Sequence, residues 1–132
     1  MYCLQPSISR TRWLAPEQIT SPSIAAPTEK ADIWSFGSLC IEVFTGKDPY
    51  HGCSDFQVQF LLSQGIHPEH PGSTAAGLSP KMWDLMQSCW QIDPTQRPSM
   101  SEVQSTICDM FPRPDGESFF LSLERAYPYP NM

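Results

Sequence analysis

The sequence has few basic residues and no long apolar run, and these shortages exclude whole classes of function. Lysine and arginine together number 8 against 14 aspartates and glutamates, so the net charge is −6. Nucleic-acid binding needs a basic stripe that this balance does not supply, and no polybasic patch favours a membrane surface. No apolar run approaches the ~20 residues of a membrane-spanning helix, and the N-terminal residues lack the order of a signal peptide. We therefore expect an intracellular, cytoplasmic protein whose partners are neither nucleic acid nor membrane.

Cysteine pairs at redox or metal-binding spacing are also lacking. The chain has 5 cysteines, an odd number without any C-x-x-C pair. Their positions are Cys3, Cys40, Cys53, Cys89 and Cys108. Reduced buried cysteine behaves as a small hydrophobe, so we interpret them as structural, with a redox or zinc role as the alternative.

Metal-ligand spacing is only approximate elsewhere in the chain. His67, Glu69 and His70 are loosely spaced like ligands, but Pro68 and Pro71 make the stretch extended and no fourth ligand is near in sequence. We therefore expect no metal site.

Proline, by contrast, is abundant. The 14 prolines are roughly twice the usual share, and most fall between periodic segments. Hydrophobic residues make up 40% of the chain, which is enough for a packed core. These features predict a mainly α fold of short helices joined by irregular loops.

The segment 28–46 is predicted to be a central helix. Thr28 is a suitable N-cap and Gly46 stands where a helix end is expected. At about 100° per residue, apolar side chains cover most of the circumference, which is typical of a buried helix. Asp32 projects between Leu39 and Val43 on the apolar side, where a carboxylate would need a partner.

The remaining polar residues of that helix form one narrow stripe, namely Ser35, Ser38 and Glu42. Other helices are predicted from their capping residues. They are residues 55–64 after Ser54 and Gln57, a helix from Pro80 after Ser79, a helix after Ser99 and Glu102 that Pro112 ends, and a short turn at 119–126. Residues 55–64 also alternate in a way that is compatible with a strand.

Three separated blocks of this sequence resemble protein kinases. Residues 12–17, Arg-Trp-Leu-Ala-Pro-Glu, resemble the Ala-Pro-Glu motif that closes the activation segment, with a preceding tryptophan as in tyrosine and tyrosine-kinase-like groups. Residues 30–37 with 45–50 look like helix F and its following turn, and residues 89–98 are similar to the segment joining helices H and I. Their order and spacing make the resemblance specific over roughly residues 9–111.

The resemblance implies the helical C-terminal subdomain of a protein-kinase-like fold, that is, the C-lobe portion, incomplete and without the N-lobe sheet. Residues 1–14 would be the end of the activation segment, 15–111 a partial kinase domain, and 112–132 a C-terminal tail.

Roles for individual residues follow from the resemblance alone. Glu17 would pair with the distant Arg97 as a clasp between two loops, with Trp34 packed nearby and Trp90 supporting the core. Asp32 would anchor the backbone of the catalytic loop, which this sequence does not contain. Without the resemblance, Glu17 and Arg97 could equally be unrelated surface charges, and Asp32 a solvated residue of a first helical turn.

The resemblance also implies a substrate-receiving segment, here called the substrate segment, made of Arg12, Trp13, Leu14, Ala15 and Pro16. Ser9 and Arg10 stand where tyrosine-kinase-like members usually carry Gly-Thr or Gly-Ser, so the acceptor, Ser/Thr or Tyr, stays open. Ser7, Ser9 and Thr11 are either phosphorylation sites or solvated loop hydroxyls.

The family transfers phosphate from ATP with Mg²⁺ to protein hydroxyls, but the ATP-binding and catalytic motifs are absent from this sequence. Its 7 glycines stand singly, so they form no phosphate-cradling loop, and few residues precede Ala15. We therefore expect an inactive part of a kinase domain, with no cofactor of its own, that meets a protein or peptide substrate or a partner kinase. The alternatives are a stand-alone helical interaction module and a pseudokinase-like regulator that competes for another kinase's substrate.

Overall fold

The computed structural model describes residues 10–20 and 28–112. Its elements are η1 (Arg10–Trp13), α1 (Pro16–Thr20), α2 (Glu29–Thr45), α3 (Asp55–Ser63), η3 (Gly72–Thr74), α4 (Pro80–Cys89), η4 (Pro94–Gln96) and α5 (Met100–Met110). These ranges contain helices and loops and no strand, which confirms the mainly α prediction. The predicted turn at 119–126, and with it Cys3, Ser7 and Ser9, lies outside the described residues.

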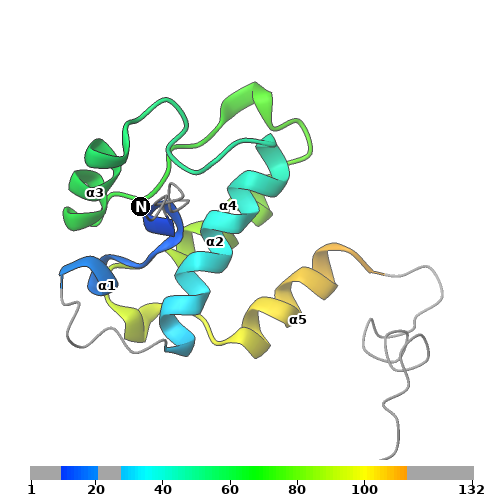
Figure 1. The fold of residues 1–132 in the computed structure, drawn as a ribbon. Helices are drawn as coiled ribbons and strands as arrows, with labels where there is room; N and C mark the ends of the chain where they lie inside the picture. The colour runs from blue at the N-terminus through cyan, green and yellow to red at the C-terminus, as the bar shows by residue number, and fades with distance from the viewer. Residues whose placement is uncertain (1–9, 21–27, 113–132) are drawn as a thin grey trace, which may run out of the picture.

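Helix α2 lies at the centre of the arrangement, with α1 and α3 on one side and α5 on the other (Figure 1). Its start is fixed because the Thr28 side chain accepts a hydrogen bond from the Ala31 N–H at 3.0 Å. Its end is fixed by Gly46, which has φ 69° and donates its N–H to Glu42 O at 2.8 Å. The left-handed conformation at Gly46 favours glycine, so both predicted boundaries are confirmed.

The buried face of α2 differs from the one that periodicity suggested. Ser38, which belongs to the predicted polar stripe, is fully buried and accepts a hydrogen bond from Trp90 Nε1 at 3.3 Å. Leu39 and Val43 are 48% and 74% exposed. The reason is that small residues let α4 approach α2 closely, and the serine hydroxyl satisfies the buried indole N–H.

The prediction that Asp32 lies on a buried face is wrong, because the buried face of α2 is a different one. It does lie between Leu39 and Val43, as projected, but that stripe faces solvent and Asp32 is exposed. A solvated carboxylate needs no partner, so the expected conflict of a buried charge does not arise.

Helix α3 begins at a complete capping box, which decides against the strand alternative. Gln57 N donates to Ser54 Oγ at 3.2 Å and Ser54 N donates to Gln57 Oε1 at 2.8 Å. Val58 and Leu62 are fully buried, whereas Phe56 and Phe60 are 81% and 61% exposed. The helix therefore turns an aromatic pair toward solvent.

Helices α4 and α5 complete the core against α2. Ser79 caps α4 with Pro80 in its first turn, and Ser99 with Glu102 forms the second capping box, at the start of α5. α4 buries Met82, Leu85, Met86 and Cys89, whereas α5 fully buries only Val103. Phe111, which follows the last residue of α5, is 60% exposed.

Among the described helices, none combines the length and the apolar character that a membrane crossing requires.

Candidate functional site

The most specific polar contact in the structure joins Glu17 to Arg97. Arg97 Nη1 donates to Glu17 Oε1 at 2.7 Å and Nη2 donates to Glu17 Oε2 at 2.9 Å. The Arg97 side chain is fully buried and that of Glu17 is 34% exposed. This paired, two-bond geometry is the strong form of an arginine–carboxylate contact, and it ties the start of α1 to the loop before α5.

The other donors of Arg97 are satisfied by backbone carbonyls. Nε donates to Gln91 O at 2.8 Å, Nη1 to Lys30 O at 2.8 Å and Nη2 to Ile92 O at 3.5 Å. Each of the five N–H groups of the guanidinium therefore has an acceptor, which is what a buried charge requires. Lys30 also contacts the backbone of Arg97, because its Nζ donates to Arg97 O at 2.8 Å.

The pairing shifts the titration of Glu17. Burial by itself would raise the pKa of this carboxyl, but the hydrogen bonds from Arg97 and from the backbone, together with the positive charge of Arg97, outweigh it. The pKa of Glu17 ends below its ordinary value of 4.5. The carboxylate is therefore charged, and paired, throughout the neutral range.

Trp34 lies directly beside this ion pair. Its side chain is fully buried, and Arg97 Cζ sits 5.2 Å from the centroid of its ring, within the range of a cation–π contact. Its Nε1 is buried without a hydrogen-bond acceptor among the described residues, so the packing of the ring must outweigh that cost.

The substrate segment runs along the start of α2 and reaches the loop before α3. Ser35 Oγ donates to Trp13 O at 2.7 Å, Leu14 N donates to Thr11 O at 3.2 Å, and Ala15 N donates to Gln18 Oε1 at 3.0 Å. Ala15 and Pro16 are buried.

Arg12 is the side chain of that segment with most partners. Its Nη1 donates to Pro49 O and Tyr50 O, each at 3.1 Å, and its Nη2 donates to Cys53 O at 2.8 Å and to Asp55 Oδ1 at 3.1 Å. Sequence reasoning placed Arg12 in the segment but did not foresee these contacts, because a carbonyl acceptor leaves no mark in the sequence.

Trp90 packs in an aromatic cluster that the sequence did not indicate. His67 stacks on Trp90 with ring centroids 4.9 Å apart, and Trp83 meets Trp90 edge-on at 5.6 Å. His70 in turn contacts Trp83 at 4.6 Å. The two histidines weighed as loose metal ligands thus lie against tryptophan rings, and the described residues contain no group of three or more side chains able to hold a metal ion.

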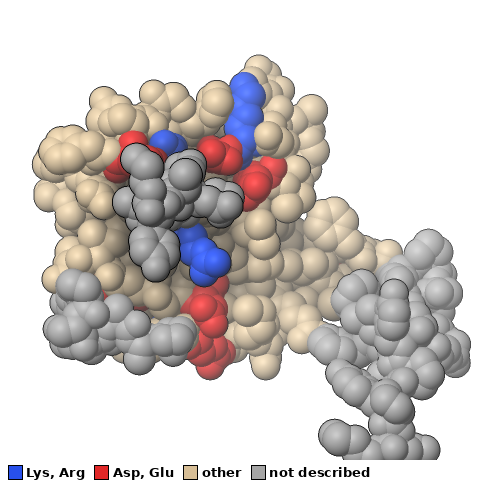
Figure 2. Space-filling view, viewed as in Figure 1, with Lys and Arg blue, Asp and Glu red and all other residues tan. Residues whose placement is uncertain are grey.

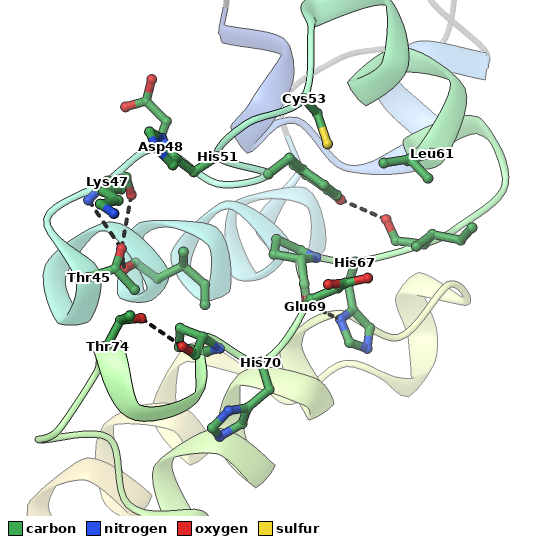
Figure 3. Close-up of a pocket in the computed structure, with 15 residues that line it drawn as sticks. Thr45, Lys47, Asp48, His51, Cys53, Leu61, His67, Glu69, His70 and Thr74 are labelled. Atoms are coloured by element: carbon green, nitrogen blue, oxygen red, sulfur yellow. Dashed lines mark hydrogen bonds between the residues drawn. The ribbon is translucent and has the colours of Figure 1, made fainter.

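A hollow of about 360 Å³ lies between the end of α2 and residues 66–74 (Figure 3). His51, His67 and His70 all line it, together with Lys47 and with acidic and apolar residues. Charges of both signs on one rim do not select a single class of ligand. The face shown in Figure 2 likewise carries both basic and acidic side chains, and the basic ones are separated from one another.

Comparison with known proteins matches this chain to one family. The family model described as protein tyrosine and serine/threonine kinase matches residues 2–107. The chain is 37% identical over 101 residues to tyrosine-protein kinase ABL2 of Homo sapiens, a match that covers 76% of this chain and 8% of that protein.

Two further relatives give matches of the same extent. Inactive tyrosine-protein kinase 7 of Homo sapiens is 38% identical over 103 residues, covering 74% of this chain and 9% of that protein. The high affinity nerve growth factor receptor of Gallus gallus is 36% identical over 97 residues, covering 73% of this chain and 11% of that protein. The chain thus spans only a small part of the length of the relatives it matches, and it belongs to the family of protein tyrosine and serine/threonine kinases.

Proposed function

We propose that this chain is the helical C-terminal part of a protein kinase domain that contributes the substrate segment and not the chemistry of phosphoryl transfer. The observation that carries the proposal is the two-bond contact of Glu17 with the buried Arg97. This contact fixes the start of α1, and therefore the end of the substrate segment, against the loop that precedes α5.

In the complete domain, phosphate would pass from ATP with Mg²⁺ to a Ser/Thr or Tyr hydroxyl of a protein in the cytoplasm. Such transfer needs a phosphate-covering loop, a paired lysine, a catalytic aspartate and a metal-binding Asp-Phe-Gly motif. The 132-residue sequence contains none of these motifs. The chain alone is therefore inactive and binds neither ATP nor Mg²⁺, and its partner is a protein or peptide substrate or a partner kinase.

A melting experiment with the purified 132-residue chain tests this proposal. A ligand at one hundred times its dissociation constant stabilises a protein by about 2.7 kcal/mol, which would raise Tm by several degrees. We expect the same Tm with saturating Mg-ATP as with Mg²⁺ alone, and no transfer of labelled phosphate to a peptide. A clear rise in Tm, or measurable transfer, would overturn the proposal.

The second candidate is a helical interaction module or a pseudokinase-like regulator. Two observations favour it: Leu39 and Val43 are exposed on α2, and one relative is named an inactive tyrosine-protein kinase. Sequencing the 5′ end of the messenger RNA separates the candidates. In-frame codons for His-Arg-Asp and Asp-Phe-Gly elements ahead of Met1 would support the kinase-domain proposal, whereas an in-frame stop codon there would support the module.

A further inference from the structure

Arg12 connects the substrate segment to residues 49–54, here called the pre-α3 loop. Three of its four hydrogen bonds go to backbone carbonyls of that loop, on Pro49, Tyr50 and Cys53. The fourth goes to Asp55, the first residue of α3. The Arg12 side chain is only 14% exposed, so its guanidinium is held within the structure and is not a freely moving surface charge.

The pre-α3 loop has an unfavourable backbone conformation near its start. Tyr50 has φ 57°, the only positive φ of a non-glycine residue among residues 10–20 and 28–112. A bulky residue adopts this conformation only where its surroundings fix it. Here the Tyr50 hydroxyl donates to Ile66 O at 2.7 Å, and Tyr50 O accepts hydrogen bonds from Cys53 N at 3.0 Å and from Arg12.

No other residue of the substrate segment makes such a connection. Of the hydrogen bonds made by Arg12, Trp13, Leu14, Ala15 and Pro16, those to the pre-α3 loop and to Asp55 all come from Arg12. Trp13 is instead held by Ser35 of α2, and Ala15 by Gln18 of α1. The hydrogen bonds that tie the segment to the pre-α3 loop therefore come from one guanidinium.

We infer that Arg12 is a positioning residue that fixes the substrate segment against the pre-α3 loop, and that it acts through the backbone carbonyls and not through its ion pair with Asp55. Asp55 is 63% exposed, and an exposed ion pair contributes little. A guanidinium presents several donors in a rigid plane, whereas a lysine ammonium is a single point. Lysine should therefore fail to replace Arg12. The kind of substrate that the segment would receive rests on the proposed function. The contact of Arg12 with the pre-α3 loop does not.

Hydrogen exchange of backbone amides in the 132-residue chain, read by mass spectrometry, tests the inference. Five proteins are compared: the unchanged chain, Arg12→Ala, Arg12→Lys, Asp55→Asn and the matched control Arg10→Ala. Arg10 lies in the same η1 turn and is exposed, and no hydrogen bond to the described residues holds its side chain. Its removal changes the net charge as Arg12→Ala does.

We expect Arg12→Ala to speed exchange on the order of tenfold in peptides covering 10–18 and 49–57, where opening is local. Exchange in α4 and α5 stays as in the unchanged chain. Arg12→Lys behaves like Arg12→Ala, while Asp55→Asn and Arg10→Ala behave like the unchanged chain.

Four results would overturn the inference. They are unchanged exchange in Arg12→Ala, full rescue by lysine, an Asp55→Asn protein that exchanges as fast as Arg12→Ala, and faster exchange throughout the chain, including α5. If Arg12→Ala does not fold, the lysine variant carries the test. Binding of Mg-ATP would refute the proposed function and leave this result untouched, so the two failures are distinguishable.

Discussion

Arg97 makes most of the polar contacts that build the site. Full burial of a charge is costly unless the group is paired and every donor is satisfied. Glu17 supplies the opposite charge, and the carbonyls of Gln91, Lys30 and Ile92 take the remaining N–H groups. An interaction of this kind orients loops more than it adds net stability, since both charges had to leave water.

Glu17→Gln should change the acid sensitivity of the fold. Because the folded pKa of Glu17 lies below its ordinary value of 4.5, the stability from this group is present above that value and is lost as pH falls through the folded pKa. In urea unfolding, the difference in unfolding free energy between the unchanged chain and Glu17→Gln should be constant from about pH 8 to about pH 5 and shrink at lower pH.

Glu69→Gln is the matched control for that series, because Glu69 is exposed and its carboxylate accepts no hydrogen bond from the described residues. Its difference from the unchanged chain should be small at every pH. A Glu17→Gln difference that grows on acidification would show that Glu17 is not held in its charged form.

Single residues also show which contacts could be predicted from the sequence and which could not. The pairing of Glu17 with Arg97 could be expected, because the resemblance supplied both partners. The exposure of Asp32 could not, because a projection shows which residues share a face but not whether another segment covers that face. The acceptors of Arg12 were also beyond reach, since nothing in a sequence shows where carbonyl groups point.

At the scale of elements, helix ends were predicted well and helix faces less well. Thr28, Ser54, Ser79 and Ser99 cap helices where expected, because capping is a local interaction of adjacent residues. The buried face of α2 was misjudged because its apolar residues nearly surround the helix. The close approach of Trp90 to small residues of α2 then decides which face of the helix is buried. The periodicity of apolar residues does not predict this contact.

Gly37→Ala should weaken the packing of α2 on α4. A Cβ at this position would lie 2.8 Å from Trp90 Nε1 and 3.2 Å from Cys89 Cβ. The Trp90 side chain cannot easily move away, because its ring stacks on His67 and its Nε1 donates a hydrogen bond to Ser38. Overpacking costs about 1–3 kcal/mol, against about 1 kcal/mol gained from the helix propensity of alanine.

We therefore expect a net loss of about 1 kcal/mol of unfolding free energy in urea for Gly37→Ala. Leu39→Ala, on the exposed side of the same helix, is the control and should change the unfolding free energy by less. A Gly37→Ala chain more stable than the original would mean that α2 and α4 are farther apart than described.

For the whole molecule, the described residues form one core around α2, in which the substrate segment, α4 and the loop before α5 are all fixed. The mainly α class followed from capping, periodicity and proline placement, and the kinase family from three separated blocks. Neither source predicts which apolar residues stay uncovered, such as Val43 and Phe56, because exposure depends on what else packs against the chain. Segments far apart in sequence are therefore joined at one point, the contact of Glu17 with Arg97.

A double-mutant cycle of Glu17→Ala and Arg97→Met, measured by urea unfolding, tests that junction most directly. Residues in contact usually show interaction energies of about 0.5–3 kcal/mol. Since Glu17 is 34% exposed and partly screened by water, we predict a coupling of about 1–2 kcal/mol. Single-mutant effects that add to the double-mutant effect within about 0.5 kcal/mol would contradict the account.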